Sequence, residues 1–564
     1  MKVILDDALG RRRLVFREPR GTISAYAAAD VPGALASVTE ALSAGHHVAG
    51  WFAYELGYCL EKKLASRPVA DTGSPLLKLG VYNAPQADAP RTSGRSYAGP
   101  LKPEWPQTTY AAAFARVRDY IAAGDIYQAN LSFRAGFAFA GDPLELYERL
   151  LAQSGAAHCA YLDDSERQIL SLSPELFFAL SSDGTITARP MKGTAPRQGL
   201  DAAARAALAA STKDRAENLM IVDLIRNDLG RIAEIGSVAV KDLFEVETYP
   251  TLHTMVSTVT ARKRPEVGVA ELLKALFPCG SVTGAPKIRA MEILQELEAS
   301  PRGAYCGAIG YFSPNGAAHF NVAIRTLSLA GGRGELGIGG GVVQDSRAES
   351  EYAECLLKAR FFEIGRRKIE LIETLCFDKE FVRLESHLHR MKDSASLFDL
   401  PFDALEARSA LENAISGKTG ALRVRLTLGE TGGHSATAEP LAPNPSHWTY
   451  SLSGARTQST DLLLRHKTNW RELYDGEVAR LGSDEVVFQN ERGEITEGAR
   501  SNIFVERDGI LLTPPLEAGV LDGRLRAELI AEGKAREATL FPDDLAKGLF
   551  FGNSLRGLIT GVPA

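Results

Sequence analysis

Hydrophobic and polar residues alternate over short distances along the whole chain, and this pattern predicts a mixture of strands and helices. From Tyr110 to Lys358, apolar strands punctuated by glycine alternate with helical segments. A new series begins near Ile369 with the strand LIETLCF, the helix ESHLHRMKDSASLF and the alternating strand ALRVRLTL. Apolar residues at every second position favour strands, and those three or four apart favour amphipathic helices. The pattern predicts an α/β (α+β) protein.

The same pattern predicts two domains. Residues 71–106 are rich in Pro, Gly, Ser and Thr and are expected to form a long surface excursion. The chain is helical and then basic from about Phe361 to Lys368, with no flexible Gly/Ser linker. We therefore place a boundary near residue 366, between a first domain at 1–365 and a second at 366–564.

Composition restricts the class of protein. Of the 564 residues, 45% are hydrophobic and 24% charged, as in soluble globular proteins. The net charge of −6 argues against a nucleic-acid partner. The six cysteines form no CxxC pair, which favours a reducing compartment over a disulfide framework. The apolar stretch from Ala49 to Tyr54 is far shorter than the roughly 18 residues that span a membrane. We expect a cytoplasmic protein without a membrane partner.

An acidic helix is the first candidate for chemistry. Ser346 with Glu349 is a capping-box pattern that opens a helix. Glu351, Glu354 and Lys358 then follow at i, i+3 and i+7, so they share one face. The preceding strand ELGIGGGVV has glycines that would let a ligand approach the backbone. The alternative is a solvated acidic face after a glycine-rich hairpin.

A second helix, RAENLMIVDLIRNDLGR, carries Glu217 near its start and is expected to end with Gly230 as its C′ residue. Glu217 could serve only as a partner of the helix dipole. Together with Glu354 it could instead hold Mg²⁺, which prefers one or two carboxylates plus substrate oxygens.

Two loops complete the candidates in the first domain. RPMKGT predicts a turn around Lys192 at a strand end. Such a lysine is either solvated or, when its amine is kept deprotonated, a nucleophile. GSVTGAPK precedes the helix IRAMEILQEL and could hold a carboxylate with its backbone amides.

These segments occur in one order with IYQANLSF, SPELFF, TYPTLHTMVSTV, RGAYCGAIGY and FNVAIRT. In this respect the chain resembles the chorismate-utilising enzymes, which include component I of the anthranilate and aminodeoxychorismate synthases. The resemblance covers most of residues 1–360. It implies a sandwich of antiparallel sheets flanked by helices, with chorismate in a cleft.

The resemblance also implies roles. In the family, the turn at Lys192 carries Ala in anthranilate synthases and Lys in aminodeoxychorismate synthases, where the lysine adds to C2 before ammonia adds to C4. Glu175, in SPELFF, matches the acid that protonates the departing hydroxyl. Glu217 and Glu354, with Glu351 nearby, match the Mg²⁺ ligands. The other matched positions are His253, a catalytic histidine, and the substrate-binding Tyr305, Arg325, Gly284, Gly341 and Lys358.

The nitrogen source is expected to lie outside this chain. A glutaminase needs a cysteine nucleophile on a strained glycine-flanked turn with a partner histidine. None of the six cysteines has that context. We expect free ammonia, or ammonia from a separate glutamine amidotransferase subunit.

The second domain has the parts that pyridoxal phosphate needs. Lys467 supplies an amine, Glu497 a carboxylate near a strand end, and TPPLEAGVLDGRLRAELI a loop that leads into a helix N-terminus. With ESHLHRM they resemble the fold-type IV pyridoxal-phosphate enzymes, which include aminotransferases and aminodeoxychorismate lyase. The resemblance implies two subdomains with the cofactor between them, and commonly a homodimer. Further phosphate contacts implied by it are Arg390, Arg524, Leu525, Asn553 and Ser554.

The two resemblances imply one route. The first domain would convert chorismate and ammonia into 4-amino-4-deoxychorismate, and the second would eliminate pyruvate to give 4-aminobenzoate, a folate precursor. One alternative is an anthranilate synthase component I fused to a class IV aminotransferase. Another is a second domain that acts only as a binding module.

Overall fold

The computed structural model describes residues 1–7, 12–64, 67, 73–87, 92–196, 202–248 and 252–564. The chain forms two compact units. Unit 1 comprises Met1–Pro90, Pro100–Phe137 and Tyr147–Gly365, and unit 2 comprises Arg91–Gly99, Ala138–Leu146 and Arg366–Ala564. Two short segments from the N-terminal half of the chain thus belong to unit 2.

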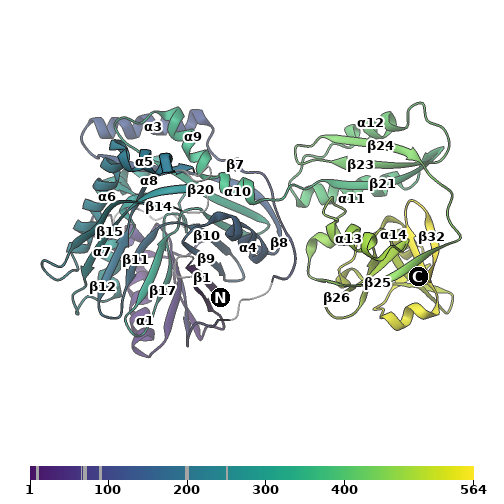
Figure 1. The fold of residues 1–564 in the computed structure, drawn as a ribbon, viewed down its shortest axis with the longest axis horizontal. Coiled ribbons are helices and arrows are strands. Elements are labelled where there is room, and N and C mark those ends of the chain that lie inside the picture. The colour runs from purple at the N-terminus through teal and green to yellow at the C-terminus, as the bar shows by residue number, and fades with distance from the viewer. Residues whose placement is uncertain (8–11, 65–66, 68–72, 88–91, 197–201, 249–251) are drawn as a thin grey trace. The chain divides into compact units, whose positions relative to one another are not determined.

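Unit 1 is built on two large sheets (Figure 1). The path of the first sheet is β16 (Gly284–Ala285), β8 (Gln128–Gly141), β20 (Arg333–Val342), β19 (Thr326–Ala330), β10 (Gln168–Ser173), β9 (His158–Asp163), β1 (Lys2–Asp7) and β2 (Arg12–Phe16), and β7 (Lys102–Pro103) also pairs with β8. The last residues of β8 belong to unit 2, where they pair with β6 (Ser96–Ala98). The path of the second sheet is β13 (Met191–Pro196), β15 (Leu252–Arg262), β12 (Thr185–Arg189), β11 (Leu176–Leu180), β18 (Ala318–Val322), β17 (Ala308–Phe312), β4 (His47–Phe52), β5 (Leu77–Tyr82) and β3 (Gly21–Ala25), with β14 (Ala239–Thr248) on β15. Neighbouring pairs such as β19–β20 and β17–β18 run antiparallel.

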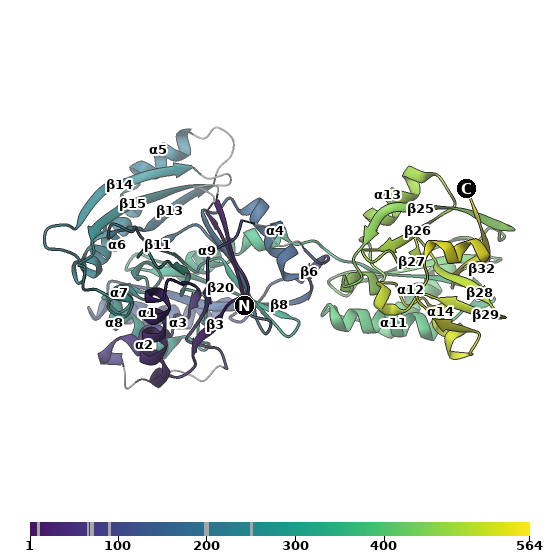
Figure 2. The same cartoon turned by 90° about the horizontal axis from the view of Figure 1, so that it is seen from below.

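Apolar side chains of the two sheets meet in a shared core. Phe16 and Leu162 of the first sheet pack in one cluster with Trp51 and Ile309 of the second. A larger cluster lies between the second sheet and the helices that cover it, among them α1, α6 and α7 (Figure 2). The helices of this half of the chain are α1 (Val31–Ser43), α2 (Leu56–Leu60), α3 (Gln107–Ala122), α4 (Pro143–Ser154), α5 (Ala202–Ala210), α6 (Thr212–Gly230), α7 (Val269–Leu276), α8 (Lys287–Leu297), α9 (Ala348–Lys358) and α10 (Arg360–Gly365). The expected sandwich of antiparallel sheets with flanking helices is confirmed.

Unit 2 consists of two subdomains. The smaller has a four-stranded sheet with α11 (Leu384–Leu397) and α12 (Ala404–Ile415) beside it, as Figure 1 shows. Its strands are β22 (Glu380–Phe381), β21 (Leu371–Asp378), β23 (Leu422–Leu428) and β24 (His434–Pro440). Alternate residues of β23 are buried, from Leu422 to Leu428, because that face packs in the core with α11 and α12.

The larger subdomain has an eight-stranded mixed sheet, in which β25 runs parallel to β26 and β32. Its strands are β27 (Ile495–Gly498), β26 (Glu485–Asn490), β25 (His447–Thr457), β32 (Gly557–Pro563), β31 (Leu549–Asn553), β28 (Asn502–Arg507), β29 (Ile510–Thr513) and β30 (Ala535–Glu537). The helices α13 (Glu472–Leu481) and α14 (Arg524–Ala531) accompany this sheet. Among the described residues, no helix is long and apolar enough to cross a membrane.

The structure corrects four local predictions. The stretch 71–106 is not only a surface excursion, because it contains β5, which is paired on both edges inside the second sheet. Ser346 does not cap α9, since its hydroxyl donates to Glu351 instead. Gly230 is the last residue of α6, not the residue beyond its end. Lys192 lies inside β13, with the break between strands at Pro190.

Candidate active sites

A cavity of about 380 Å³ in unit 1 brings together most of the residues predicted for the first site. Its walls come from β13, β20, α6, α9 and the connections between them. The predicted residues that line it are Glu175, Lys192, Glu217, Tyr305, Arg325, Gly341, Glu351, Glu354 and Lys358. Two do not line it, namely His253 and Gly284.

Lys192 lies against the glycine-rich strand β20. A Cβ atom added to Gly341 would lie only 3.3 Å from its amine Nζ, so the missing side chain makes room for the lysine. The next residue, Gly193, has a φ of +81° and faces Asp214 of α6 closely. Burial lowers the pKa of Lys192, because it disfavours the charged amine. A larger share of the neutral, nucleophilic amine follows.

Glu175 follows the end of β10 and is 4% exposed. Its Oε1 accepts a hydrogen bond of 2.7 Å from the Ser281 hydroxyl. Burial raises the pKa of Glu175 to about 7, and the opposing effects of Ser281 and Lys192 are smaller. A carboxyl with such a pKa can donate a proton near neutral pH.

Besides Glu175 and Asp214, three glutamates line the cavity, each with a partner. Glu351 accepts a bond of 2.7 Å from Ser346. Glu354, at the exposed rim, lies 3.0 Å from Lys358. Glu217 lies 3.9 Å from Lys213, and burial raises its pKa. The described residues contain no cluster of three His, Cys, Asp or Glu side chains that could already hold a metal ion.

Two cationic side chains could bind carboxylates of a ligand. Arg325 is largely buried with a φ of +49°, and its guanidinium has no hydrogen bond or ion pair with the described residues. Lys358 donates to the carbonyl of Gly339 at 3.0 Å as well as to Glu354. A buried, unpaired arginine is costly unless an anion compensates it.

His253 and Gly284 occupy other places. His253 lies on β15 at 2% exposure, with Nδ1 3.0 Å from the Thr248 hydroxyl and Nε2 buried without a partner among the described residues. Gly284 has a φ of +145°, and a Cβ there would lie 2.3 Å from the Gln128 carbonyl. Its backbone conformation and this close approach both require glycine.

In unit 2, Lys467 lies between β25 and α13, next to strand β21 of the smaller subdomain. Its carbonyl accepts a bond of 2.8 Å from the amide of Ile372 on β21. Burial, with repulsion from Arg390, lowers the pKa of Lys467 to about 8. Part of this amine is therefore neutral near physiological pH.

Glu497 lies on β27 and is buried. Its Oε1 accepts from the Tyr474 hydroxyl at 2.7 Å and its Oε2 from the amide of Leu521 at 3.0 Å. Burial raises the pKa of Glu497 to about 7. A nearby cation would lower that pKa again.

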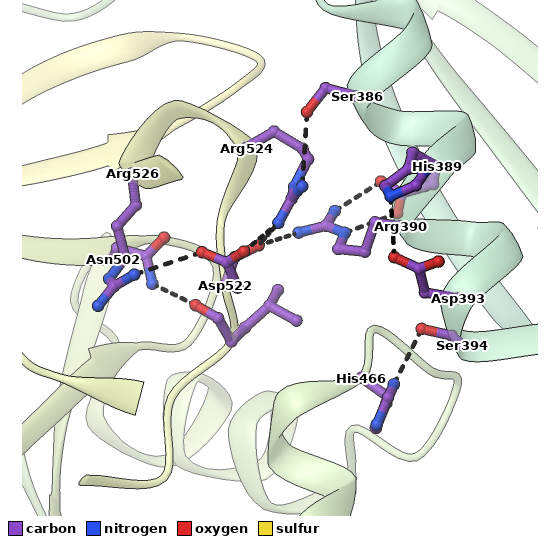
Figure 3. A network of polar contacts seen from close by, with 12 residues as sticks. Ser386, His389, Arg390, Asp393, Ser394, His466, Asn502, Asp522, Arg524 and Arg526 are labelled. Carbon is purple, nitrogen blue, oxygen red and sulfur yellow. Dashed lines mark hydrogen bonds and ion pairs between the residues drawn. The ribbon is translucent and has the colours of Figure 1, made fainter. Parts of the chain in front are cut away.

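A polar network connects α11 with the loop before α14 (Figure 3). Arg390 donates to the Asp522 carbonyl at 2.8 Å and pairs with Glu373 at 2.6 Å. Arg524 donates to the same carbonyl at 2.8 Å. Burial acts to raise the pKa of Glu373, but Arg390 and His387 outweigh it, so the pKa lies well below its usual range. This carboxylate stays charged and fixes the arginine.

The remaining predicted residues lie around this network. His387 lies 2.6 Å from Glu373 through Nδ1 and 2.7 Å from the Ser554 hydroxyl through Nε2. Asn553 is the last residue of β31, and Leu525 is in the first turn of α14. The structure thus links Arg390 to Ser554 through two buried side chains.

Comparison with known proteins shows which families the two parts of the chain match. Residues 2–363 match the model of the chorismate binding enzyme family, and residues 370–561 match that of amino-transferase class IV. The chain belongs to the chorismate binding enzymes. Its C-terminal part is a class IV amino-transferase domain, a type that implies pyridoxal phosphate.

Several curated relatives match the chorismate-binding part. Aminodeoxychorismate synthase component 1 of Klebsiella aerogenes is 41% identical over 334 residues, which is 54% of this chain and 74% of that protein. The protein of the same name from Escherichia coli (strain K12) is 46% identical over 248 residues, or 43% of this chain and 54% of that protein. The chain thus spans between about half and three quarters of these relatives.

A solved structure supports the fold of the same part. Anthranilate synthase component I from Streptococcus pneumoniae TIGR4 is 26% identical, and the match covers 64% of this chain and 92% of that chain with a TM-score of 0.55. This part of the chain therefore shares its fold with an anthranilate synthase component I, and the fold alone does not define its product.

The residues present fit both expected cofactors. Three carboxylates around one cavity are hard oxygen donors, which suit Mg²⁺ when a substrate supplies further oxygens. In unit 2, the Nε of Arg524 is buried without a partner in the described part of the chain, beside the first amides of α14. An anionic phosphate would satisfy both.

Sequence reasoning did not identify three partners of the site residues. Ser281 lies in the GSVTGAPK loop, and its small polar side chain was the available signal. Glu373 is a lone acid within the apolar strand LIETLCF, a pattern that indicates a buried partner. Nothing in the sequence pointed to Tyr474, because it reaches Glu497 from a different element.

Proposed function

We propose that this chain makes 4-aminobenzoate from chorismate in two steps. Residues 1–365 would form 4-amino-4-deoxychorismate, and residues 366–564 would release pyruvate from it. The observation that carries the proposal is that Lys192 lines the same cavity as Glu175, whose raised pKa lets it carry a proton near neutral pH. The names of the relatives of the first half support the same amination.

In the first step, Lys192 acts as the nucleophile. Its neutral amine forms a bond to C2 of chorismate, while the C4 hydroxyl takes the proton of Glu175 and leaves as water. Ammonia then bonds to C4, and the Lys192 amine leaves from C2. Without the lysine, ammonia would add to C2 and the product would be 2-aminobenzoate.

Other residues of the cavity bind and orient the substrate. Arg325, Lys358 and Tyr305 hold its carboxylates, and the absent side chain of Gly341 lets the ring approach β20. Glu217 and Glu354, with Glu351, would hold Mg²⁺, which neutralises a carboxylate and fixes its orientation. The nitrogen would come from ammonia released by a separate glutamine amidotransferase subunit.

In the second step, Lys467 is the base. Pyridoxal phosphate, when bound, supplies an electron sink for the electrons of the bond that loses its proton. The neutral Lys467 amine removes the proton from C4 of aminodeoxychorismate, pyruvate departs from C3, and the ring becomes aromatic. Glu497 would face the pyridine nitrogen, and Arg390 and Ser554 the phosphate. We also propose a homodimer.

One incubation tests the whole proposal. The purified chain is mixed with chorismate, Mg²⁺, ammonium and pyridoxal phosphate, and the products are separated by chromatography. We expect 4-aminobenzoate and pyruvate, and accumulation of aminodeoxychorismate when pyridoxal phosphate is omitted. Formation of 2-aminobenzoate instead would favour an anthranilate synthase and refute the role of Lys192.

A further inference from the structure

Two short segments from the N-terminal half of the chain lie inside unit 2, next to the residues that lead to Lys467. They are residues 92–99, which include β6, and residues 138–146, which include the end of β8. We call them the β6–β8 pair, because β6 and β8 are hydrogen-bonded there in antiparallel register. None of the roles proposed above uses this pair.

The β6–β8 pair is built into the core of the smaller subdomain. Tyr97 has 0% exposure, and its ring centroid lies 5.0 Å from that of Phe398 and 6.4 Å from that of Trp470. Ala138 and Ala140 belong to the same hydrophobic cluster. Close packing of this kind fixes the pair relative to Trp470.

Arg95, next to β6, joins the two ends of the connection that carries Lys467. Its Nε donates to Oδ2 of Asp461 at 2.8 Å, and its Nη1 donates to the Trp470 carbonyl at 3.1 Å. Asp461 precedes Lys467 by six residues, and Trp470 follows it by three. The side chains of Arg95 and Asp461 are 27% and 8% exposed, so solvent screens this ion pair less than one on the open surface.

The start of the connection has further contacts with the β6–β8 pair. The hydroxyl of Thr460 donates to the carbonyl of Ser93 at 2.9 Å. A Cβ atom added to Gly94 would lie 3.0 Å from Cα of Asp461, so the two backbones approach closely. Asp461 also accepts a hydrogen bond of 2.9 Å from the amide of Leu463 and caps the short helix before the lysine. The position of this helix is therefore fixed by the N-terminal half of the chain.

The middle of the connection is held by the smaller subdomain itself. Nδ1 of His466 lies 2.9 Å from the Ser394 hydroxyl of α11, and the amide of Asn469 donates to the carbonyl of Glu370 at 3.0 Å. These contacts hold the backbone beside Lys467, while the contacts of Arg95 hold its two ends. Displacement of a reacting group by about 1 Å can lower a rate about a hundred-fold, so both sets of contacts matter for the lysine.

We propose that Arg95 is a positioning residue for Lys467, so that the N-terminal half of the chain completes the active site of the C-terminal half. The inference rests on the proposed function, because Lys467 is taken there as the base of pyruvate release. Arg95 acts through the backbone of residues 461–470 and not on the substrate. It does not line the chorismate cavity of unit 1, so its loss should leave amination unchanged.

Substitutions at Arg95 in the full chain test this proposal. Arg95→Gln removes the charge that binds Asp461. The kcat for pyruvate release from added aminodeoxychorismate, calculated per bound pyridoxal phosphate, should then fall about ten-fold or more. The Kd for pyridoxal phosphate, measured by absorbance, should rise, because its aldehyde bonds to the Lys467 amine. Arg95→Lys keeps a cation beside Asp461 and should recover most of the lost kcat.

Arg507→Gln is the matched control. It breaks an ion pair of the same length, 2.8 Å, between Arg507 and Asp544 of the larger subdomain. In the described structure, neither residue has a hydrogen bond or ion pair with residues 461–470. Because kcat is calculated per bound cofactor, a general loss of stability does not lower it. The control should therefore keep the kcat and the Kd of the unsubstituted chain.

Contrary results distinguish the positioning role from the proposed function. Unchanged kcat and Kd in Arg95→Gln would overturn the positioning role, and so would an equal fall of kcat in Arg507→Gln. If the unsubstituted chain binds pyridoxal phosphate but releases no pyruvate from aminodeoxychorismate, the proposed function fails. The Kd then decides the role of Arg95 alone: a higher Kd in Arg95→Gln supports it, and an unchanged Kd overturns it.

Discussion

The protonation of Glu175 should control how the amination rate depends on pH. Burial raises the pKa of this carboxyl from 4.5 to about 7, which favours the protonated form by about 3 kcal/mol. At pH 6 about 90% of Glu175 is then protonated, compared with about 3% for an ordinary glutamate. Since the acid must carry its proton, the rate should fall as pH rises through about 7.

A substitution at Ser281 should shift the pH at which the amination rate falls. Its hydroxyl stabilises the carboxylate through the 2.7 Å bond, so Ser281→Ala should raise the pKa of Glu175 further. A hydrogen bond to a charged group contributes about 1.5–3 kcal/mol, so the midpoint should rise by about one pH unit or more. The neutral form of Lys192, favoured by high pH, should govern the rising limb of the profile.

The assay is the kcat for aminodeoxychorismate at saturating chorismate and a fixed concentration of neutral ammonia, from pH 5.5 to 9. Ser346→Ala is a matched control, because it removes a bond of the same length to a different carboxylate, Glu351. The reasoning is refuted if Ser281→Ala lowers the midpoint or leaves it in place. It is also refuted if Glu175→Gln keeps the same falling limb.

Three further outcomes follow from the structure. Lys192→Ala should abolish 4-aminobenzoate or divert the product to 2-aminobenzoate, as chromatography with fluorescence detection would show, and normal output would contradict its role as nucleophile. Lys467→Ala should let aminodeoxychorismate accumulate while its formation continues, and pyruvate release at the normal rate would contradict its role as base. Glu373→Gln should destabilise unit 2 by about 3 kcal/mol, because Arg390 keeps a buried charge without its counterion. Urea unfolding would measure this loss, and a change below about 0.5 kcal/mol would contradict it.

Regular periodicity allowed several elements to be predicted from the sequence. The strands β20, β21 and β23 and the helix α11 all lie where the pattern of apolar residues indicated. The strand β5 was missed because the residues around it are rich in proline and glycine, which hid a short apolar run. Local composition identifies the loops on either side of such a strand. It does not reveal the neighbouring strands whose pairing makes the segment a strand.

Individual contacts were harder to predict than elements. The pattern at Ser346 suits a helix cap, but the hydroxyl binds Glu351 because that carboxylate is buried and needs a donor. The motifs indicated which residues share the first cavity, although His253 does not line it. The partners Ser281 and Tyr474 depend on how distant segments meet, and no local spacing encodes that.

The loop at Leu521 and Asp522 contacts residues at both ends of the proposed pyridoxal-phosphate site. The Leu521 amide donates a hydrogen bond to Glu497, and the Asp522 carbonyl accepts hydrogen bonds from Arg390 and Arg524. Two adjacent peptide units therefore set the spacing between the carboxylate and the guanidinium groups. A mutation that shifts either peptide unit would disturb the hydrogen bonds of Glu497 and of Arg390 together. Natural variation at these two positions should therefore be confined to side chains that leave the backbone conformation unchanged.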